Sequence, residues 1–228
     1  STETVIGTCG QVWRGGIMYT ILIVDDSPMI VDVFSTMLER GGYRPVTAFS
    51  GEECLKVMKT APPDLVLLDI MMEPMDGWET LERIKADPET RDIPVLMLTA
   101  KPLTPEEANE YGPYIEDYIL KPTTHHQLYE AIERVLARRH SIAADIERAR
   151  KAGVDPQLVD EYERLSRSVD INKRLLKILE TTYSIKDART GIGEDITRAI
   201  KSMAASIKLQ EERLNQVRIR FADLLEAR

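Results

Sequence analysis

The amino-acid sequence predicts an α/β domain with a doubly wound parallel sheet, followed by an all-α region that forms a helical hairpin or coiled coil. Short apolar runs alternate with amphipathic helical patterns through the first part of the 228-residue chain. Several of these runs lack alternation between apolar and polar residues, which is typical of strands buried on both faces of a parallel sheet. The second part carries heptad patterns instead.

The first strand covers residues 19–24 and ends in two adjacent aspartates, Asp25 and Asp26. Ser27 and Pro28 then provide a helix cap and a proline in the first turn, so a helix is expected to begin here. Strands and helices continue to alternate along the chain. In order, the expected elements are a strand at 43–48, a helix at 50–60, a strand at 65–68, a helix at 77–86, a strand at 93–98, a weakly helical segment at 101–113 and a strand at 118–120.

Polar side chains follow the carboxyl ends of four of these strands. Asp69 ends the apolar run LVLL, at the edge where open α/β sheets bind ligands. Asp25, Asp26 and Asp69 repel one another unless a cation lies between them, and such oxygen ligands suit Mg²⁺ and not zinc. Thr99 and Lys121 follow the ends of two further strands. The sequence therefore predicts a magnesium site with a hydroxyl and an amine beside it.

These residues resemble the receiver domain of two-component response regulators, the CheY-like family, from about Tyr19 to Arg139. The resemblance is carried by the motifs ILIVDDSP, LVLLDIMMEPMDG, VLMLTA and YILKP. The loop MMEPMDGWE is similar to receivers of methanogenic archaea, whereas Glu73 and Pro74 depart from the Pro and then Gly that the family more often has there. The resemblance implies a five-stranded, flavodoxin-like sheet with strand order 2-1-3-4-5.

The resemblance also implies a role for each site residue. A histidine kinase or phosphotransfer protein donates a phosphoryl group to Asp69, whose added charge is offset by Mg²⁺ and Lys121. Thr99 is then drawn toward the phosphoryl group and Tyr118 turns inward, which changes a distant surface. The chain is thus expected to be a signalling phosphoacceptor, not an enzyme, with at most self-catalysed phosphotransfer and autodephosphorylation. The implied residues are Asp69, Lys121 and Thr99 for phosphorylation, Asp25, Asp26, Asp69 and the backbone carbonyl of Met71 for Mg²⁺, and Thr99 and Tyr118 for switching.

The last receiver helix is expected to continue unbroken to about Lys151, because its apolar positions keep a four-three rhythm beyond residue 139. Gly153 then breaks the helix. Asp155 and Pro156 form the cap and first position of the next helix.

Two heptad helices follow, separated by a glycine-containing linker at residues 186–195, and they predict an antiparallel hairpin. Each apolar stripe contains one strongly polar residue, Asn172 in the first helix and Gln210 in the second. Folding the hairpin at its linker brings these two residues to one level, where a hydrogen bond between them would fix the register.

The expected organisation has four parts. They are an N-terminal extension at residues 1–17, a receiver at 18–139, a helix continuation and linker at 140–154, and the hairpin at 155–228. Two helices leave one side of their apolar seam open, and pairing two hairpins into a four-helix bundle would close it. The sequence therefore predicts a homodimer through the C-terminal helices.

The charge distribution argues against a nucleic-acid partner. The net charge is −8, and residues 141–228 hold 17 Lys and Arg interleaved with 15 Asp and Glu. This interleaving is typical of a solvated coiled-coil face, so a protein output target is expected. The alternative is a DNA-binding transcriptional regulator that uses its C-terminal helices. The basic residues presented to DNA would then be Arg164, Arg167, Lys173, Arg174 and Lys177.

Cysteine usage and hydropathy predict a cytoplasmic protein. Cys9 and Cys54 lie far apart and have no metal-binding spacing, which indicates a reducing compartment. No apolar run reaches the length of a membrane span, and the first residues lack the pattern of a signal peptide. No membrane partner is therefore expected.

Overall fold

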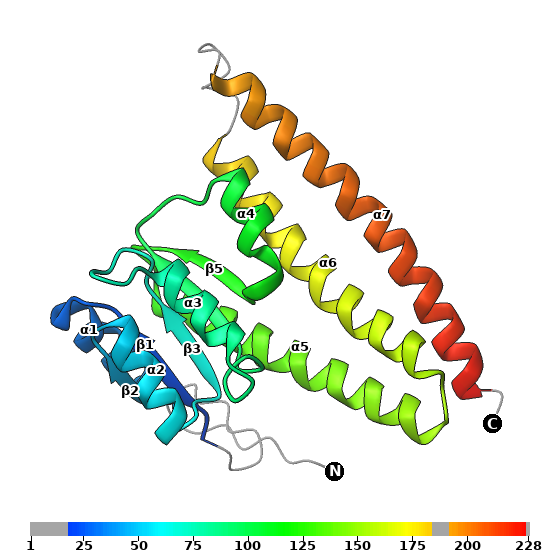
Figure 1. Cartoon of the computed structure of the whole chain (residues 1–228), viewed down its shortest axis with the longest axis horizontal. Helices are drawn as coiled ribbons and strands as arrows, with labels where there is room; N and C mark the ends of the chain where they lie inside the picture. Colours follow the sequence, from blue (N-terminus) through cyan, green and yellow to red (C-terminus); the bar gives the residue numbers. More distant parts are fainter. Residues whose placement is uncertain (1–17, 184–191, 227–228) are drawn as a thin grey trace. The chain divides into compact units, whose positions relative to one another are not determined.

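The structure is a computed structural model that describes residues 18–183 and 192–226, and its chain divides into two compact units (Figure 1). The first, here called the sheet unit, contains the described residues up to Lys101 together with residues 118–132. The second, the helical unit, contains residues 102–117 and the chain from Glu133 onward. Residues 1–17, which the sequence predicts to be an N-terminal extension, lie outside the described residues. So does the larger part of the predicted linker.

The sheet has five strands in the order β2-β1-β3-β4-β5, as the sequence predicts. The register aligns the strand ends, because Val24 at the end of β1 is paired with both Ala48 of β2 and Leu68 of β3. The residues that follow these strands therefore emerge along one edge of the sheet. The strands are β1 (Thr20–Val24), β2 (Arg44–Ala48), β3 (Leu65–Leu68), β4 (Val95–Thr99) and β5 (Asp117–Leu120).

Helices α1 (Pro28–Arg40), α2 (Gly51–Thr60) and α3 (Gly77–Ala86) connect the strands of the sheet unit. The cap of α2 is Ser50, whose side chain accepts a hydrogen bond from the backbone of Glu53. All of β3 and β4 is buried, which explains why their sequences lack polar alternation. The predicted doubly wound architecture is confirmed.

The helical unit begins with the short helix α4 (Pro105–Tyr111) and the 3₁₀ turn η1 (Gly112–Tyr114). The sequence shows only a weak, proline-interrupted helical signal here. The helix forms because Thr104 and Glu107 make a capping box, in which each side chain accepts a hydrogen bond from the backbone of the other.

Three long helices supply the rest of the helical unit, and Figure 1 shows α6 and α7 running side by side. They are α5 (His125–Lys151), whose residues from Glu133 belong to this unit, α6 (Pro156–Thr182) and α7 (Ile192–Glu226). The predicted continuation of α5 to Lys151 is confirmed. Asp155 caps α6 by accepting a hydrogen bond from the backbone of Gln157 at 3.0 Å.

The predicted register of the hairpin is also confirmed. The side-chain amide of Asn172 donates a hydrogen bond to Gln210 Oε1 at 3.3 Å. Ser168 lies in the same polar layer, since its hydroxyl donates to Gln210 and accepts from Asn172. Helix α7 begins at Ile192, inside the segment that the sequence assigned to the linker.

The hairpin differs from the prediction in one respect, because α5 adds a third helix to its core. The shared core joins apolar residues from all three helices and from the turn before α6. It consists of Ile142, Ile146, Ala149, Val154, Leu158, Val159, Tyr162, Leu165, Val169, Leu214, Val217 and Phe221. The expected open side of the seam is therefore covered along this half of the hairpin.

Helix α6 also buries a second face toward α4 and η1, which the heptad pattern does not reveal. Leu175, which lies outside the heptad positions, is buried beside η1, whereas Leu176, which occupies a heptad position, is only half-buried. The approach is close, since a Cβ atom on Gly112 would lie 3.2 Å from Leu175 Cδ1. Among the described residues, no helix combines the length and apolar character needed to cross a membrane.

Candidate functional site

The three predicted aspartates lie together at the carboxyl edge of the sheet. Asp25 and Asp69 are buried and Asp26 is exposed, and one carboxylate oxygen from each lies within 4.8 Å of the others. Backbone hydrogen bonds fix this arrangement. The Asp69 N–H donates to the carbonyl of Val24 at 2.9 Å, and the Asp25 N–H donates to that of Ala48.

Lys121 completes the cluster from the end of β5. Its ammonium group forms an ion pair with Asp25 and lies 3.4 Å from Asp69 Oδ2. The Lys121 N–H donates to the carbonyl of Thr99 at 2.8 Å, so the ends of β4 and β5 are tied together. Among the described residues, Lys121 is the one cation that pairs with this cluster, and it contacts Asp25 and Asp69, so the three carboxylates leave an excess of negative charge. This cluster of Asp25, Asp26, Asp69 and Lys121 is called the acid site below.

The donor set fits a hard divalent cation. Among the described residues, Asp69 Oδ1 is buried and has no hydrogen-bond partner. An unpartnered buried carboxylate oxygen is unfavourable unless a cation or a donor reaches it. Carboxylate oxygens are the ligands that Mg²⁺ prefers, often only one or two of them together with waters and phosphate oxygens.

Gly77 shapes the loop that carries Asp69, a contact that sequence reasoning did not identify. A Cβ atom at this position would lie 2.1 Å from the backbone oxygen of Asp69, so only glycine fits at the start of α3. The Gly77 N–H donates to the carbonyl of Ile70 at 2.9 Å, which closes the loop. The dipeptide Asp76-Gly77 is the sequence signal for such a tight turn.

Thr99 and Tyr118, the expected switching pair, are both buried in the sheet unit. The Thr99 hydroxyl accepts a hydrogen bond from the N–H of Lys101, and the Tyr118 hydroxyl donates to the carbonyl of Lys101 at 2.6 Å. The ring of Tyr118 stacks on Trp78 with centroids 6.4 Å apart. Both side chains thus engage the segment that follows β4, and Tyr118 occupies a buried position that the sequence reasoning assigned to the phosphorylated state.

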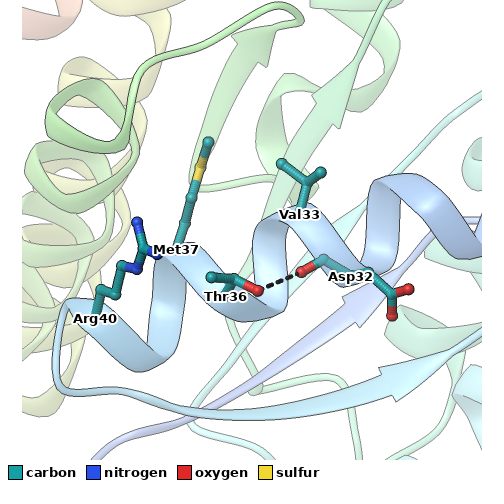
Figure 2. A pocket seen from close by; sticks show the side chains of 5 residues that line it. All are labelled: Asp32, Val33, Thr36, Met37 and Arg40. Carbon is teal, nitrogen blue, oxygen red and sulfur yellow. Dashed lines mark hydrogen bonds between the residues drawn. The ribbon is translucent and has the colours of Figure 1, made fainter.

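A shallow hollow of about 330 Å³ lies elsewhere on the sheet unit, on the surface of α1. Figure 2 shows the side chains that line it, all from this one helix. They are Asp32, Val33, Thr36, Met37 and Arg40. Met29 and Val33 on the same helix are exposed apolar residues.

Comparison with known protein families gives two matches along the chain. Residues 21–133 match the family described as "Response regulator receiver domain". Residues 138–223 match the family described as "Metanogen output domain 2". The two matches are consecutive, with the second covering the three-helix core.

Several solved structures and curated proteins are similar to the first part of the chain. The N-terminal domain of a response regulator receiver protein from Methanoculleus marisnigri is 88% identical, with a TM-score of 0.46, over 53% of this chain and 98% of that one. A CheY-like receiver domain protein from Methanospirillum hungatei is 28% identical, with a TM-score of 0.50. The match covers 55% of this chain and 98% of that protein's chain.

Among curated proteins, the alkaline phosphatase synthesis transcriptional regulatory protein PhoP of Bacillus subtilis is 34% identical over 61% of this chain. The DNA-binding dual master transcriptional regulator RpaA of Synechocystis is 32% identical over 63%. In each case the match spans only 57% of the relative's own length.

Proposed function

This chain belongs to the response regulator family, with a receiver domain followed by a methanogen output domain, and on that premise we propose that Asp69 accepts a phosphoryl group from a histidine kinase or phosphotransfer protein. A carboxylate oxygen of Asp69 attacks the phosphorus atom. The bond from phosphorus to the donor nitrogen breaks as the new oxygen–phosphorus bond forms. The observation that carries this proposal is the buried, unpartnered Oδ1 atom of Asp69 in a cluster with excess negative charge.

The acid site is suited to orient this transfer. We propose that Mg²⁺ is held by Asp25, Asp26, Asp69 and the backbone carbonyl of Met71. When bound, the ion supplies positive charge that neutralises the transferred phosphoryl oxygens. Lys121 provides the remaining cationic charge, because its ammonium lies within 3.4 Å of Asp69. Thr99 and Tyr118 would respond to the phosphorylated state through their shared contact with Lys101.

The exposed face of α1 is the surface proposed for docking of the phosphoryl donor. Met29 is 72% exposed, and Val33 borders the hollow in Figure 2. The helix begins three residues after Asp25, so a protein bound to this face lies next to the acid site. Apolar residues flanked by charged ones are typical of protein interfaces.

The helical unit is proposed to deliver the output through a protein target, with homodimerisation through its helices. Support comes from the N-terminal half of α7, where the heptad residues Ile196, Ile200 and Met203 are only half-buried. The three-helix core does not extend to these residues. A second copy of the chain would cover them.

The named functions of the curated relatives favour a second candidate, a DNA-binding regulator. The ion pairs weigh against it. Arg167 and Arg174 pair with Glu116 and Asp117, and Lys173 pairs with Glu211. Three of the five basic residues that would face DNA therefore already make ion pairs within the chain.

The phosphoacceptor proposal is tested by incubating the chain with acetyl phosphate and Mg²⁺ and locating the added phosphoryl group by mass spectrometry. Wild type should be phosphorylated on Asp69, and both Asp69→Asn and chelation of Mg²⁺ should abolish the modification. The exposed Asp32→Asn variant is the matched control and should be phosphorylated normally. Phosphorylation that persists in Asp69→Asn would overturn the proposal.

The two output candidates are separated by solution measurements. Light scattering with and without beryllofluoride should show a dimer if the helices associate. Binding to nonspecific duplex DNA at low salt should be absent. A clear interaction that weakens as salt increases would favour the DNA-binding candidate.

A further inference from the structure

Trp78 is a buried aromatic residue that the proposed phosphoryl transfer does not use. It is 6% exposed and is the second residue of α3, directly after Gly77. Its ring stacks on that of Tyr118, with the centroids 6.4 Å apart and the two planes inclined by 29°. Both residues belong to the sheet unit. Because aromatic rings at centroid distances of about 4.5–7 Å attract each other beyond the effect of burial, Trp78 stabilises the position that Tyr118 occupies.

The inward position of Tyr118 is held by contacts that the chain itself supplies. Its side chain is 2% exposed, and its hydroxyl donates a hydrogen bond to the carbonyl of Lys101 at 2.6 Å. The N–H of Lys101 in turn donates to the hydroxyl of Thr99 at 3.2 Å. The ring of Trp78 and the carbonyl of Lys101 are both parts of the protein, so these contacts do not depend on phosphorylation of Asp69.

The first turn of α3 gives the ring of Trp78 a rigid support. Asp76 caps the helix, and its side chain accepts a backbone hydrogen bond within this turn at 2.8 Å. The buried hydroxyl of Thr80 donates to the carbonyl of Asp76 at 2.7 Å. Helix α2 packs closely against the same turn, since a Cβ atom on Gly51 would lie 2.2 Å from the hydroxyl oxygen of Thr80. The backbone that carries Trp78 therefore has little freedom to move.

The same turn also lies directly against the phosphoacceptor. Gly77, the residue before Trp78, approaches Asp69 so closely that an added Cβ atom would lie 2.1 Å from the backbone oxygen of Asp69. Trp78 thus links the backbone at the acid site to Tyr118 by a route that does not include the hydroxyl of Thr99. The first turn of α3 is therefore in a position to influence both the acid site and the switching aromatic.

We propose that Trp78 is a positioning residue: its stacked ring holds Tyr118 inward before Asp69 is phosphorylated, and it thereby raises the affinity of the acid site for the phosphoryl group. The proposal rests on the phosphoacceptor function proposed above. The reason is thermodynamic. If the inward position of Tyr118 accompanies phosphorylation, a contact that favours this position also favours binding of the phosphoryl group, because the coupling between the two is reciprocal.

The proposal makes two consequences measurable. In wild type, a ligand at the acid site should hardly change the surroundings of Tyr118, because the ring already lies inward. In a chain without the stack, the same ligand must draw Tyr118 inward, so it should bind more weakly and should change the surroundings of Tyr118 strongly.

The test compares Trp78→Leu with Trp78→Phe in the full chain. Leucine keeps an apolar side chain but has no ring, whereas phenylalanine keeps an aromatic ring that can stack on Tyr118. The matched control is Ile84→Val, which shortens a fully buried side chain farther along α3 and leaves the stack intact. Calorimetry measures the affinity of each protein for beryllofluoride in Mg²⁺.

The position of Tyr118 is followed separately by fluorine NMR of chains labelled with fluorotyrosine. The chain has eight tyrosines, and the resonance of Tyr118 is identified by its loss in Tyr118→Phe. Spectra of wild type and of Trp78→Leu are recorded with and without beryllofluoride. This measurement reports on the surroundings of one ring, which a general loss of stability would not move to a new position and back.

Trp78→Leu should bind beryllofluoride about fivefold more weakly than wild type, within the usual range of allosteric coupling. Trp78→Phe and Ile84→Val should bind it as wild type does. The Tyr118 resonance of wild type should stay nearly in place when beryllofluoride binds. In Trp78→Leu the resonance should start at a different frequency and move to the wild-type position on binding.

Equal or tighter beryllofluoride affinity in Trp78→Leu would overturn the proposal. So would an equal loss in Ile84→Val or Trp78→Phe, because the effect would then not depend on the stacked ring. A wild-type Tyr118 resonance that moves on binding as far as that of Trp78→Leu would also overturn it. If Trp78→Leu does not fold, Trp78→Met, with its flexible side chain, is measured in the same way.

Failure of the underlying function is seen separately. Wild type would then neither bind beryllofluoride nor become phosphorylated on Asp69. The Tyr118 resonances of wild type and Trp78→Leu without ligand would still show whether the stack holds Tyr118 inward.

Discussion

Two clusters of acids in this protein are neutralised to opposite extents. At the acid site, the part of the chain that the structure describes offers one cation, Lys121, to three aspartates, and it pairs with Asp25 and Asp69. At the start of β5, Glu116 and Asp117 are contacted by five arginines. The first cluster therefore requires a positive ligand, whereas the second already has more positive charge than it needs.

This difference separates a binding site from a structural joint. Within the described residues, a carboxylate oxygen of Asp69 is buried and has no hydrogen-bond partner, which keeps it open to a cation and to phosphorus. Glu116 instead accepts hydrogen bonds from three arginines, and its pKa is lowered by them. Perturbed buried acids are thus not all functional-site candidates, and the balance of nearby charge distinguishes the two kinds.

The largest expected effect comes from neutralising the structural cluster. Glu116→Gln leaves Arg138 buried beside Arg139 and Arg167 without their common partner. Removing one partner of a buried ion pair typically destabilises a protein by about 3–5 kcal/mol. Urea denaturation should show a loss of this order. Glu163→Gln, which removes a half-exposed acid 3.9 Å from Arg167, is the control and should change stability by less than about 0.5 kcal/mol.

Glu116 should also make the free energy of unfolding depend on pH. Because its pKa is lower in the folded chain than in the unfolded chain, its ionisation stabilises the fold above the unfolded value of about 4.3. That contribution is lost as pH falls through the folded pKa. The stability difference between wild type and Glu116→Gln should therefore shrink below about pH 4, and a difference that stays constant to lower pH would contradict this account.

Neutralising one aspartate of the acid site should stabilise the fold, whereas neutralising Glu116 should destabilise it. Asp26→Asn removes one of three mutually repelling carboxylates, so without divalent cations the variant should melt at a higher temperature than wild type. Wild type should gain about 2.7 kcal/mol from Mg²⁺ at one hundred times its dissociation constant. This gain should be much smaller in the variant. Thermal melts in chelator and in Mg²⁺ measure both effects, and an equal gain from Mg²⁺ in both proteins would exclude Asp26 as a ligand.

The sequence predicts one of these clusters and misses the other for a physical reason. Asp25, Asp26 and Asp69 each follow an apolar strand, and parallel strands bring their carboxyl ends together. Glu116 and Asp117 stand where a strand begins, and their partners are arginines farther along the chain. Such pairings depend on tertiary packing, which local sequence patterns do not encode.

The helices show the same limit. Heptad spacing correctly places Asn172 opposite Gln210, because a repeat of constant period fixes which residues of a hairpin lie at one level. It does not reveal that α6 also buries Leu175 against η1, since a helix buried on two faces no longer follows a single stripe. The weak signal before β5 likewise conceals α4, which depends on the capping box of Thr104 and Glu107.

The smallest expected effect concerns a polar layer that is neutral and satisfied within itself. Replacing both Asn172 and Gln210 by Leu removes their hydrogen bond and buries more apolar surface, so the melting temperature should rise, by the equivalent of about 1 kcal/mol. Ser168 loses both partners but is half-buried, so water can replace them. Because a polar pair in an apolar seam specifies register, the same variant should also populate several oligomeric states. If light scattering shows that the variant keeps the oligomeric state of wild type, the ion pairs and the α5 contacts fix the register without this layer.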